Sequence, residues 1–214
     1  KHVLEFSFSS IISYGLCVTI TPLKIQGKLI LKCGISEMSL KKTVVLVGMM
    51  GSGKTTVGKA LAIALNVDFM DSDYEISVAA NRSITEIFER DGDAFFRIAE
   101  TQVIKRLLAE PPCVLSTGGG AFMSKENRAL INDLGISVFL NVDLETLWER
   151  VRYKESRPLL RTANPKITLS KIFEDRLSSY NLADISVTSI GNCSIADTTQ
   201  RLLSALAERS YELN

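Results

Sequence analysis

The stretch from Thr43 to Ala62 constrains this chain more than any other, because it joins a buried strand to a helix through a glycine-rich turn. Residues Val44 to Val47 are β-branched or leucine, which is typical of a strand covered on both faces in a parallel sheet. Residues Gly48 to Thr55 follow and fit the pattern G-x-x-x-x-G-K-[ST]. Such a turn can also bind nothing, but a strand before it and a helix after it favour a phosphate site.

The chemistry of this turn suits the phosphates of a nucleotide. Glycine lets the backbone curl so that successive N–H groups point inward, and the new helix adds the positive end of its dipole. Lys54 can then reach the β- and γ-phosphates of ATP, and the Thr55 hydroxyl can join the shell of a Mg²⁺ ion. The spacing predicts a nucleotide phosphate site, and its candidate residues for binding ATP are Gly51, Ser52, Gly53, Lys54, Thr55 and Thr56.

Composition narrows the class of protein. The 214 residues suit one domain with a substantial core. Lys and Arg total 25 against 24 Asp and Glu, and this balance predicts no nucleic-acid and no membrane partner. The only histidine is His2, which argues against a histidine base or metal ligand in the site. Four cysteines without a C-x-x-C pair suit a reducing compartment, and we expect a cytoplasmic monomer.

The N-terminal segment does not fit the rest of the chain. Residues Phe6 to Leu23 carry no charge, but only about half of them are apolar, which is too few for a membrane span. Phe6 and Phe8 alternate with serine, which suits either a short strand or a loose segment. Met38 stands just ahead of the first core strand and would make a natural start. We expect residues 1–37 to be a poorly ordered or non-native leader and residues 38–214 to form the folded domain.

Beyond residue 43, short apolar runs alternate with helical patterns. Strands are expected over residues 44–47, 67–73, 113–116, 136–141 and 184–188. Helices are expected over residues 54–65, 74–80, 84–89, 94–108, 125–134, 144–151, 167–181 and 198–209. Because each strand–helix alternation requires a crossover, the pattern predicts an α/β fold of three layers, α/β/α, around a five-stranded parallel sheet.

Two carboxylates end the expected second strand. In open α/β sheets ligands sit outside the carboxyl ends of the strands, so Asp71 and Asp73 should overlook the phosphate site. One of them can address Mg²⁺ through water, and the other can accept a proton from an attacking hydroxyl. Asp73 also precedes the expected helix over residues 74–80, so a helix N-cap is an alternative role that does not exclude the first.

Other polar candidates lie further along the chain. Arg97 has Glu100 three residues on, although most pairs at this spacing are solvated and stabilise little. The glycines at 118–120 end a buried strand and allow a close approach to the backbone. The basic segment from Arg150 to Arg161 predicts a mobile lid over about residues 153–165, whose arginines neutralise a transferred phosphoryl group; a solvated basic loop is the alternative.

From about Met38 to its C-terminus the sequence resembles the shikimate kinase family. The resemblance rests on six motifs in the family's order and spacing: residues 48–56, 71–73, 87–100, 116–120, 157–160 and 176–180. It implies a P-loop fold of the nucleoside-monophosphate-kinase type. It also implies ATP-dependent phosphorylation of the shikimate 3-hydroxyl, giving shikimate 3-phosphate and ADP, in aromatic amino-acid biosynthesis.

The resemblance also implies roles for single residues. On the nucleotide side, Lys54 and the lid residue Arg157 would be catalytic. Arg157 and Arg152 would reach ATP. Thr55 would hold Mg²⁺ directly, and Asp71 would hold it through water. Arg150 is a rival to Arg152, because loop length varies there. No residue of the adenine-binding loop, between Ser189 and Thr198, is assigned.

On the substrate side, the resemblance makes Asp73 both catalytic and a ligand of the shikimate hydroxyls. Further substrate-binding residues are implied to be Arg97, Arg176, Gly118, Gly119 and Gly120, with Phe88 and Phe96 as walls for the ring. Asp93 departs from the glutamate usual in the family; the charge is kept but the reach is shorter, so no contact is assigned to it.

Two other functions compete with this one. A gluconate-type kinase shares the fold and the phosphate loop, but would not be expected to place two arginines and a triple glycine around one carboxylated ring. A nucleotide-binding switch belongs to a different class. A GTPase would need an Asn-Lys-x-Asp element, which the sequence lacks.

Overall fold

The computed structural model describes residues 12–13, 16–25 and 28–36 as backbone strands, together with residues 40–153, 158–160, 162–189 and 193–210. The chain divides into two units, Lys1–Ser39 and Leu40–Asn214. In the first unit, β1 (Ile12–Ser13), β2 (Leu16–Ile25) and β3 (Lys28–Ser36) form an antiparallel sheet. The short strand considered at Phe6 and Phe8 lies outside the described residues. That residues 1–37 are a leader stays a prediction.

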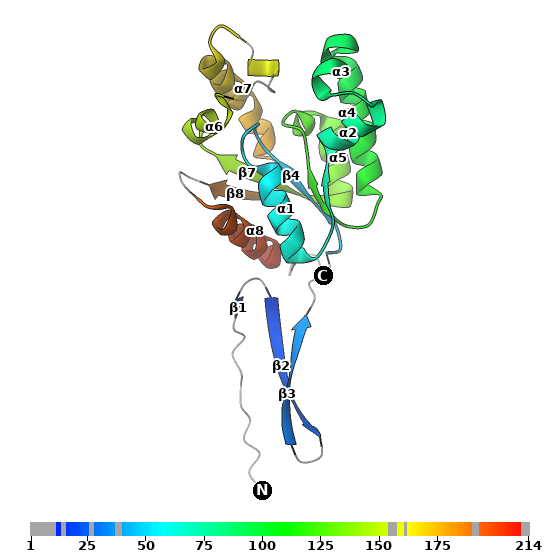
Figure 1. The fold of residues 1–214 in the computed structure, drawn as a ribbon, viewed down its shortest axis with the longest axis vertical. Coiled ribbons are helices and arrows are strands. Elements are labelled where there is room, and N and C mark those ends of the chain that lie inside the picture. Colours follow the sequence, from blue (N-terminus) through cyan, green and yellow to red (C-terminus); the bar gives the residue numbers. More distant parts are fainter. Residues whose placement is uncertain are drawn as a thin grey trace. The chain divides into compact units, whose positions relative to one another are not determined.

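The second unit is built on a five-stranded sheet in which every pairing is parallel (Figure 1). Its spatial order is β5 (Phe69–Asp71), β6 (Val114–Ser116), β4 (Thr43–Val47), β7 (Gly135–Val142) and β8 (Ile185–Ser189). The strand expected over residues 67–73 is shorter than predicted, because it ends at Asp71. The predicted sheet is otherwise confirmed in strand number and direction.

Eight helices connect and cover these strands in the described part of the second unit, each close to its expected range. They are α1 (Lys54–Leu65), α2 (Ser72–Ala80), α3 (Ile84–Arg90), α4 (Gly92–Leu108), α5 (Lys125–Leu134), α6 (Leu144–Val151), α7 (Pro165–Tyr180) and α8 (Ile195–Ser210). Two short 3₁₀ turns lie at Ala121–Met123 and Pro158–Leu160. In that part of the chain, no helix is both long and apolar enough to cross a membrane.

The central strand β4 shows why two helical layers form. Its side chains alternate between the faces of the sheet, and all five of its residues are buried. Val44 and Leu46 join a core with α1 and α8, whereas Val45 and Val47 join a core with helices α4 to α7. The three-layer α/β/α arrangement is therefore confirmed. Because the strands are parallel, their carboxyl ends meet at one edge of the sheet, and the loops that follow them build the site.

We expect a chain that begins at Met38 to fold and act normally, because every element of the five-stranded sheet lies between Leu40 and the C-terminus. Soluble yield, the thermal midpoint and kcat/KM, each compared with the full chain, check this expectation. A fall in kcat/KM of more than about tenfold, or ~1.4 kcal/mol, would show that residues 1–37 contribute to the active fold.

Candidate active site

The phosphate loop follows β4 and leads directly into α1. Its backbone takes positive φ angles of 83° at Gly51 and 95° at Gly53, a conformation that favours glycine. At Gly51 a Cβ atom would also lie 2.7 Å from Val151 Cγ1 of α6. The loop is therefore both curled and packed against a neighbouring helix, and the N-terminus of α1 opens beside it.

Lys54 and Thr55, the first residues of α1, make different contacts beside this loop. The buried Lys54 Nζ donates to Gly48 O at 2.8 Å and to Met49 O at 3.0 Å. The Thr55 hydroxyl donates to Asp71 Oδ2 at 3.1 Å. The ammonium group thus lies over the phosphate loop, and the two residues predicted to serve Mg²⁺ contact each other.

The N-cap of α2 is Asp71 and not Asp73. Asp71 Oδ1 accepts from Asp73 N at 3.1 Å and from Tyr74 N at 3.4 Å, so the helix begins at Ser72. The alternative role suggested for Asp73 is therefore wrong, because the strand ends two residues earlier than expected. Asp73 lies in the first turn of α2, and its side chain lines both cavities of the site.

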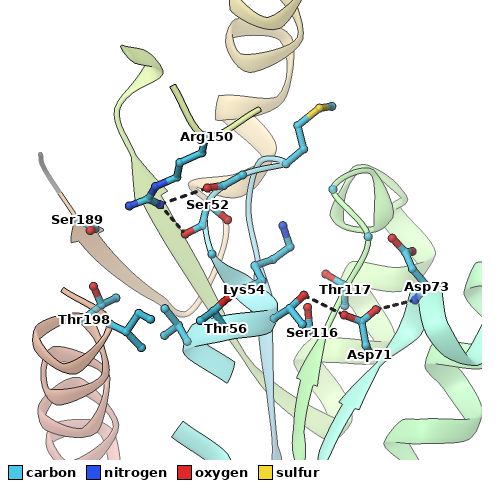
Figure 2. A pocket seen from close by; sticks show the side chains of 18 of the residues that line it. Ser52, Lys54, Thr56, Asp71, Asp73, Ser116, Thr117, Arg150, Ser189 and Thr198 are labelled. Atoms are coloured by element: carbon cyan, nitrogen blue, oxygen red, sulfur yellow. Dashed lines mark hydrogen bonds between the residues drawn. The ribbon is translucent and has the colours of Figure 1, made fainter. Parts of the chain in front are cut away.

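The first cavity has a volume of about 460 Å³ and contains the phosphate loop (Figure 2). Its other walls are formed by Asp71, Asp73, the 116–119 segment, Arg150 and the β8–α8 connection. From that connection come Ser189, Cys193, Ser194, Ile195 and Thr198. These residues fall where the adenine-binding loop was expected without assigned residues.

Arg150 of α6, and not Arg152 at the C-cap of this helix, reaches the phosphate loop. Arg150 Nη1 donates to Gly51 O at 3.2 Å and to Ser52 O at 3.5 Å (Figure 2). Arg152 instead pairs with Glu149 at 2.6 Å and contributes to neither cavity lining. The assignment of Arg152 to ATP is thus not supported by its position. Arg157 lies outside the described residues, as do residues 154–156 and 161 of the predicted lid.

The second cavity, of about 320 Å³, shares a wall with the first. Apolar and aromatic side chains cover one part of it, and charged groups and the triple glycine cover the rest. Its lining consists of Met50, Asp73, Ile84, Thr85, Phe88, Phe96, Arg97, Glu100, Gly118, Gly119, Gly120, Leu159 and Arg176. The residues common to both cavities are Met50, Asp73, Gly118 and Gly119.

The glycine turn at 118–120 is needed because charged side chains lie directly against its backbone. A Cβ atom at Gly118 would lie 2.6 Å from Asp73 Oδ1 and 2.9 Å from Glu100 Oε1. A Cβ atom at Gly120 would lie 2.7 Å from Arg97 Nη1. The close approach predicted for this turn is thus made by the carboxylates and the guanidinium group of the site itself.

Arg97 is held in place by two carboxylates and two aromatic rings. Its Nη1 donates to Glu100 Oε2 at 2.7 Å, and its Nε donates to Asp93 Oδ1 at 3.2 Å. Its guanidinium carbon lies 4.9 Å from the Phe96 ring centroid and 5.9 Å from that of Phe88. Asp93 therefore makes a contact that the sequence did not assign, and the solvated-pair interpretation is wrong because Glu100 is 0% exposed.

Burial raises the pKa of Glu100 to about 7, against the opposing effect of the Arg97 guanidinium group; Asp73 and Asp93 add to the rise. The Glu100 carboxyl group therefore binds a proton more tightly in the folded protein than in the unfolded chain. The stabilisation from the bound proton is complete below pH 4.5 and is lost as the pH rises through about 7.

We expect Glu100→Gln to remove this pH dependence. A rise in pKa from 4.5 to about 7 corresponds to about 3 kcal/mol, so wild type should lose about that much stability relative to the variant between pH 4.5 and pH 8. Urea unfolding of both proteins across this range measures the difference. Glu208→Gln, at an exposed position on α8, is the control. A constant difference between wild type and Glu100→Gln would contradict the assignment.

Comparison with known proteins agrees with this geometry. The family model for shikimate kinase matches residues 50–207. This chain belongs to the shikimate kinase family. The shikimate kinase of Ruegeria pomeroyi is 58% identical over 171 residues, which cover 80% of this chain and 88% of the relative. The shikimate kinase of Caulobacter vibrioides is 50% identical over 146 residues, which cover 68% of this chain and 73% of the relative.

Solved structures extend the family comparison to the fold. The shikimate kinase of Acinetobacter baumannii in complex with shikimate has a TM-score of 0.76 and 34% identity, covering 80% of this chain and 96% of its own. The shikimate kinase of Aquifex aeolicus has a TM-score of 0.68 and 33% identity, and the match covers 79% of this chain and 98% of that structure. A gluconokinase from Sinorhizobium meliloti, at 19% identity and a TM-score of 0.52, covering 80% and 95%, shares the fold alone. The predicted family is confirmed over the gluconate alternative.

Most of the predicted site residues thus come together around two adjoining cavities. The phosphate loop from Gly51 to Thr56, Asp71 and Asp73 line the first; Asp73, Phe88, Phe96, Arg97, Gly118, Gly119, Gly120 and Arg176 line the second. The sequence placed the β8–α8 wall between Ser189 and Thr198 but assigned none of its residues. Ser194 Oγ accepts from Asp197 N at 3.1 Å, and Asp197 Oδ2 accepts from Ser194 N at 3.1 Å. This Ser-x-x-Asp capping pattern could have placed the start of α8 at the cavity.

Proposed function

We propose that this chain transfers the γ-phosphoryl group of ATP to the 3-hydroxyl of shikimate, giving shikimate 3-phosphate and ADP. The observation that carries the proposal is that the two cavities meet at Asp73. One cavity contains a phosphate loop, and the other combines aromatic walls with two arginines. A phosphoryl donor in the first cavity can therefore face an acceptor ring in the second, with the Asp73 side chain between them. The arginines of the second cavity suit an acceptor that bears a carboxylate.

On the donor side, the N–H groups of the phosphate loop and the Lys54 ammonium group would hold the β- and γ-phosphates. The position of Arg150 over the loop adds positive charge there, a contribution that we assign to it in place of Arg152. Thr55 and, through water, Asp71 would hold Mg²⁺, which neutralises charge on the two phosphates when bound. Arg157 of the lid stays a prediction in the same role.

The contact between Thr55 and Asp71 supports their assignment to the metal. A hydroxyl and a carboxylate within 3.1 Å of each other, beside a phosphate loop, form the small oxygen donor set with which Mg²⁺ is usually bound together with nucleotide phosphates. In the described part of the chain, no group of three or more His, Cys, Asp or Glu side chains could hold a metal without such help.

On the acceptor side, Arg97 and Arg176 would bind the carboxylate of shikimate, and Phe88 and Phe96 would cover its ring. Asp73 would orient the 3-hydroxyl and take its proton. The hydroxyl oxygen then bonds to the γ-phosphorus, while the bond to the β–γ bridging oxygen breaks and ADP leaves. That the enzyme acts as a cytoplasmic monomer remains a prediction from the sequence.

A coupled assay of ADP release tests this proposal. We expect release in the presence of MgATP to depend on shikimate and to saturate with it, whereas gluconate should give only the background rate. The phosphorylated position can be read from the ³¹P–¹H couplings of the product. ADP release that ignores shikimate, or that gluconate stimulates equally, would overturn the proposed function.

A further inference from the structure

Two side chains of α7 donate to the same backbone oxygen in the wall between the cavities. Arg176 Nη1 lies 3.0 Å from Gly119 O, and the Tyr180 hydroxyl lies 2.5 Å from it. The two residues are four apart on one helix and so project from the same face. Gly119 lines both cavities, so its carbonyl group is fixed at a position that both substrates approach.

The two donors differ in their surroundings. Tyr180 is 1% exposed, its ring stacks on Phe139 with centroids 5.0 Å apart, and its hydroxyl lies near Met49 Sδ. Burial raises the pKa of Tyr180 to about 12, so the hydroxyl remains a donor at neutral pH. Arg176 is only half-buried, and its side chain lines the second cavity. One donor is therefore locked in the core, and the other lies where a ligand can compete for it.

The rest of the turn is also held by the protein. The Gly118 N–H group donates to Ser72 Oγ at 3.2 Å, and Ser72 is fully buried between Asp71 and Asp73. The turn is thus fixed from α2 through Gly118 and from α7 through Gly119. Of the side chains that hold these two peptide groups, Arg176 is the one that also lines the second cavity.

We propose that Tyr180 is a positioning residue that holds the Gly119 carbonyl group, so that the Arg176 guanidinium group can turn to an anionic group of the acceptor. The inference rests on the proposed function. The Gly119 carbonyl oxygen is partly buried, and losing its side-chain donors costs stability. Without the Tyr180 hydroxyl, a turn of Arg176 away from Gly119 would remove both of these donors. With the hydroxyl in place, Arg176 can bind the carboxylate while the shared wall stays fixed.

Tyr180→Phe tests this inference, because it removes the hydroxyl and keeps the stacked ring. We expect KM for shikimate to rise by about fivefold or more, the scale of one net hydrogen bond, while kcat and KM for ATP stay within about twofold. In an Arg176→Ala background, the same change should alter KM for shikimate by less than about twofold, because there is no guanidinium group left to release. Thr43→Val, which removes a buried hydroxyl outside both cavities, should leave KM for shikimate unchanged.

The outcomes separate this inference from the proposed function. An active wild type with an unaltered KM in Tyr180→Phe would overturn the inference alone. Effects that add fully in the double variant would do the same, since Tyr180 would then act independently of Arg176. A Tyr180→Phe protein that fails to fold would assign the hydroxyl to stability and also overturn it. A wild type without shikimate-dependent ADP release would overturn the proposed function and, with it, this inference.

Discussion

Asp73→Asn should lower kcat by at least ~10², while the protein still folds and binds MgATP. Phosphoryl transfer passes through a loose transition state, so the enzyme mainly positions groups and neutralises charge. A carboxylate at the junction of the two cavities can orient the attacking hydroxyl and accept its proton, and the amide of asparagine cannot accept it. Steady-state kinetics, with nucleotide binding measured by calorimetry, checks both parts of this expectation.

The matched control is Asp71→Asn. Asp71 is the N-cap of α2, and asparagine caps a helix as well as aspartate does, so neither variant should unfold this helix. Because Asp71 contacts Thr55 beside the phosphate loop, its variant should instead show a raised Mg²⁺ requirement, with kcat recovering at high Mg²⁺. If Asp73→Asn keeps kcat within a few fold of wild type, or recovers with Mg²⁺ as Asp71→Asn does, Asp73 is not the group that accepts the proton.

Arg97→Ala should lower kcat/KM for shikimate. The expected loss of transition-state stabilisation is ~2–5 kcal/mol, the scale for removing one partner of a desolvated charge pair. The substituted guanidinium group lines the second cavity only, so KM for ATP should change little. Arg106→Ala serves as the control, because Arg106 lies on the same helix, pairs with Glu75 and contributes to neither cavity lining. Kinetics at saturating and limiting concentrations of each substrate separate the two effects.

The buried partner of Arg97 requires a second variant. Arg97→Ala would leave Glu100, which is 0% exposed, without the guanidinium group that holds its Oε2. Arg97→Lys keeps a positive charge near Glu100 but loses the planar fork that suits a carboxylate. We expect it to be folded and still impaired for shikimate. An unaltered KM for shikimate in Arg97→Lys, or an equal loss of ATP binding in either variant, would contradict the role of Arg97.

The sequence predicted the fold because its signals are local. The apolar run at Val44 to Val47 needs only its own residues to indicate a strand buried on both faces. The later strands are likewise short apolar or alternating runs, which can be recognised without distant residues. The phosphate loop is likewise contiguous, so its motif identifies both the turn and its chemistry. The substrate-side residues come from separate elements, and they were found because the family resemblance joins them.

The corrections concern element ends and helix faces. Because β5 ends at Asp71, the cap falls there and not at Asp73. Because α4 begins at Gly92, two residues before the expected start, Asp93 lies one helical turn before Arg97 and reaches it. Two residues apart on a helix point in different directions, so the packing of α6 on the phosphate loop selects Arg150 over Arg152.

The crowded glycine turn has a consequence for inhibitor resistance. Any substitution at Gly118 or Gly120 adds a Cβ atom, which would lie within 3 Å of the Asp73 carboxylate or the Arg97 guanidinium group. A mutation there that dislodged a bound drug would at the same time displace Asp73 or Arg97, the groups to which we assign proton acceptance and substrate binding. A compound that draws its affinity from hydrogen bonds to this stretch of backbone would therefore leave the enzyme few single-step routes of escape.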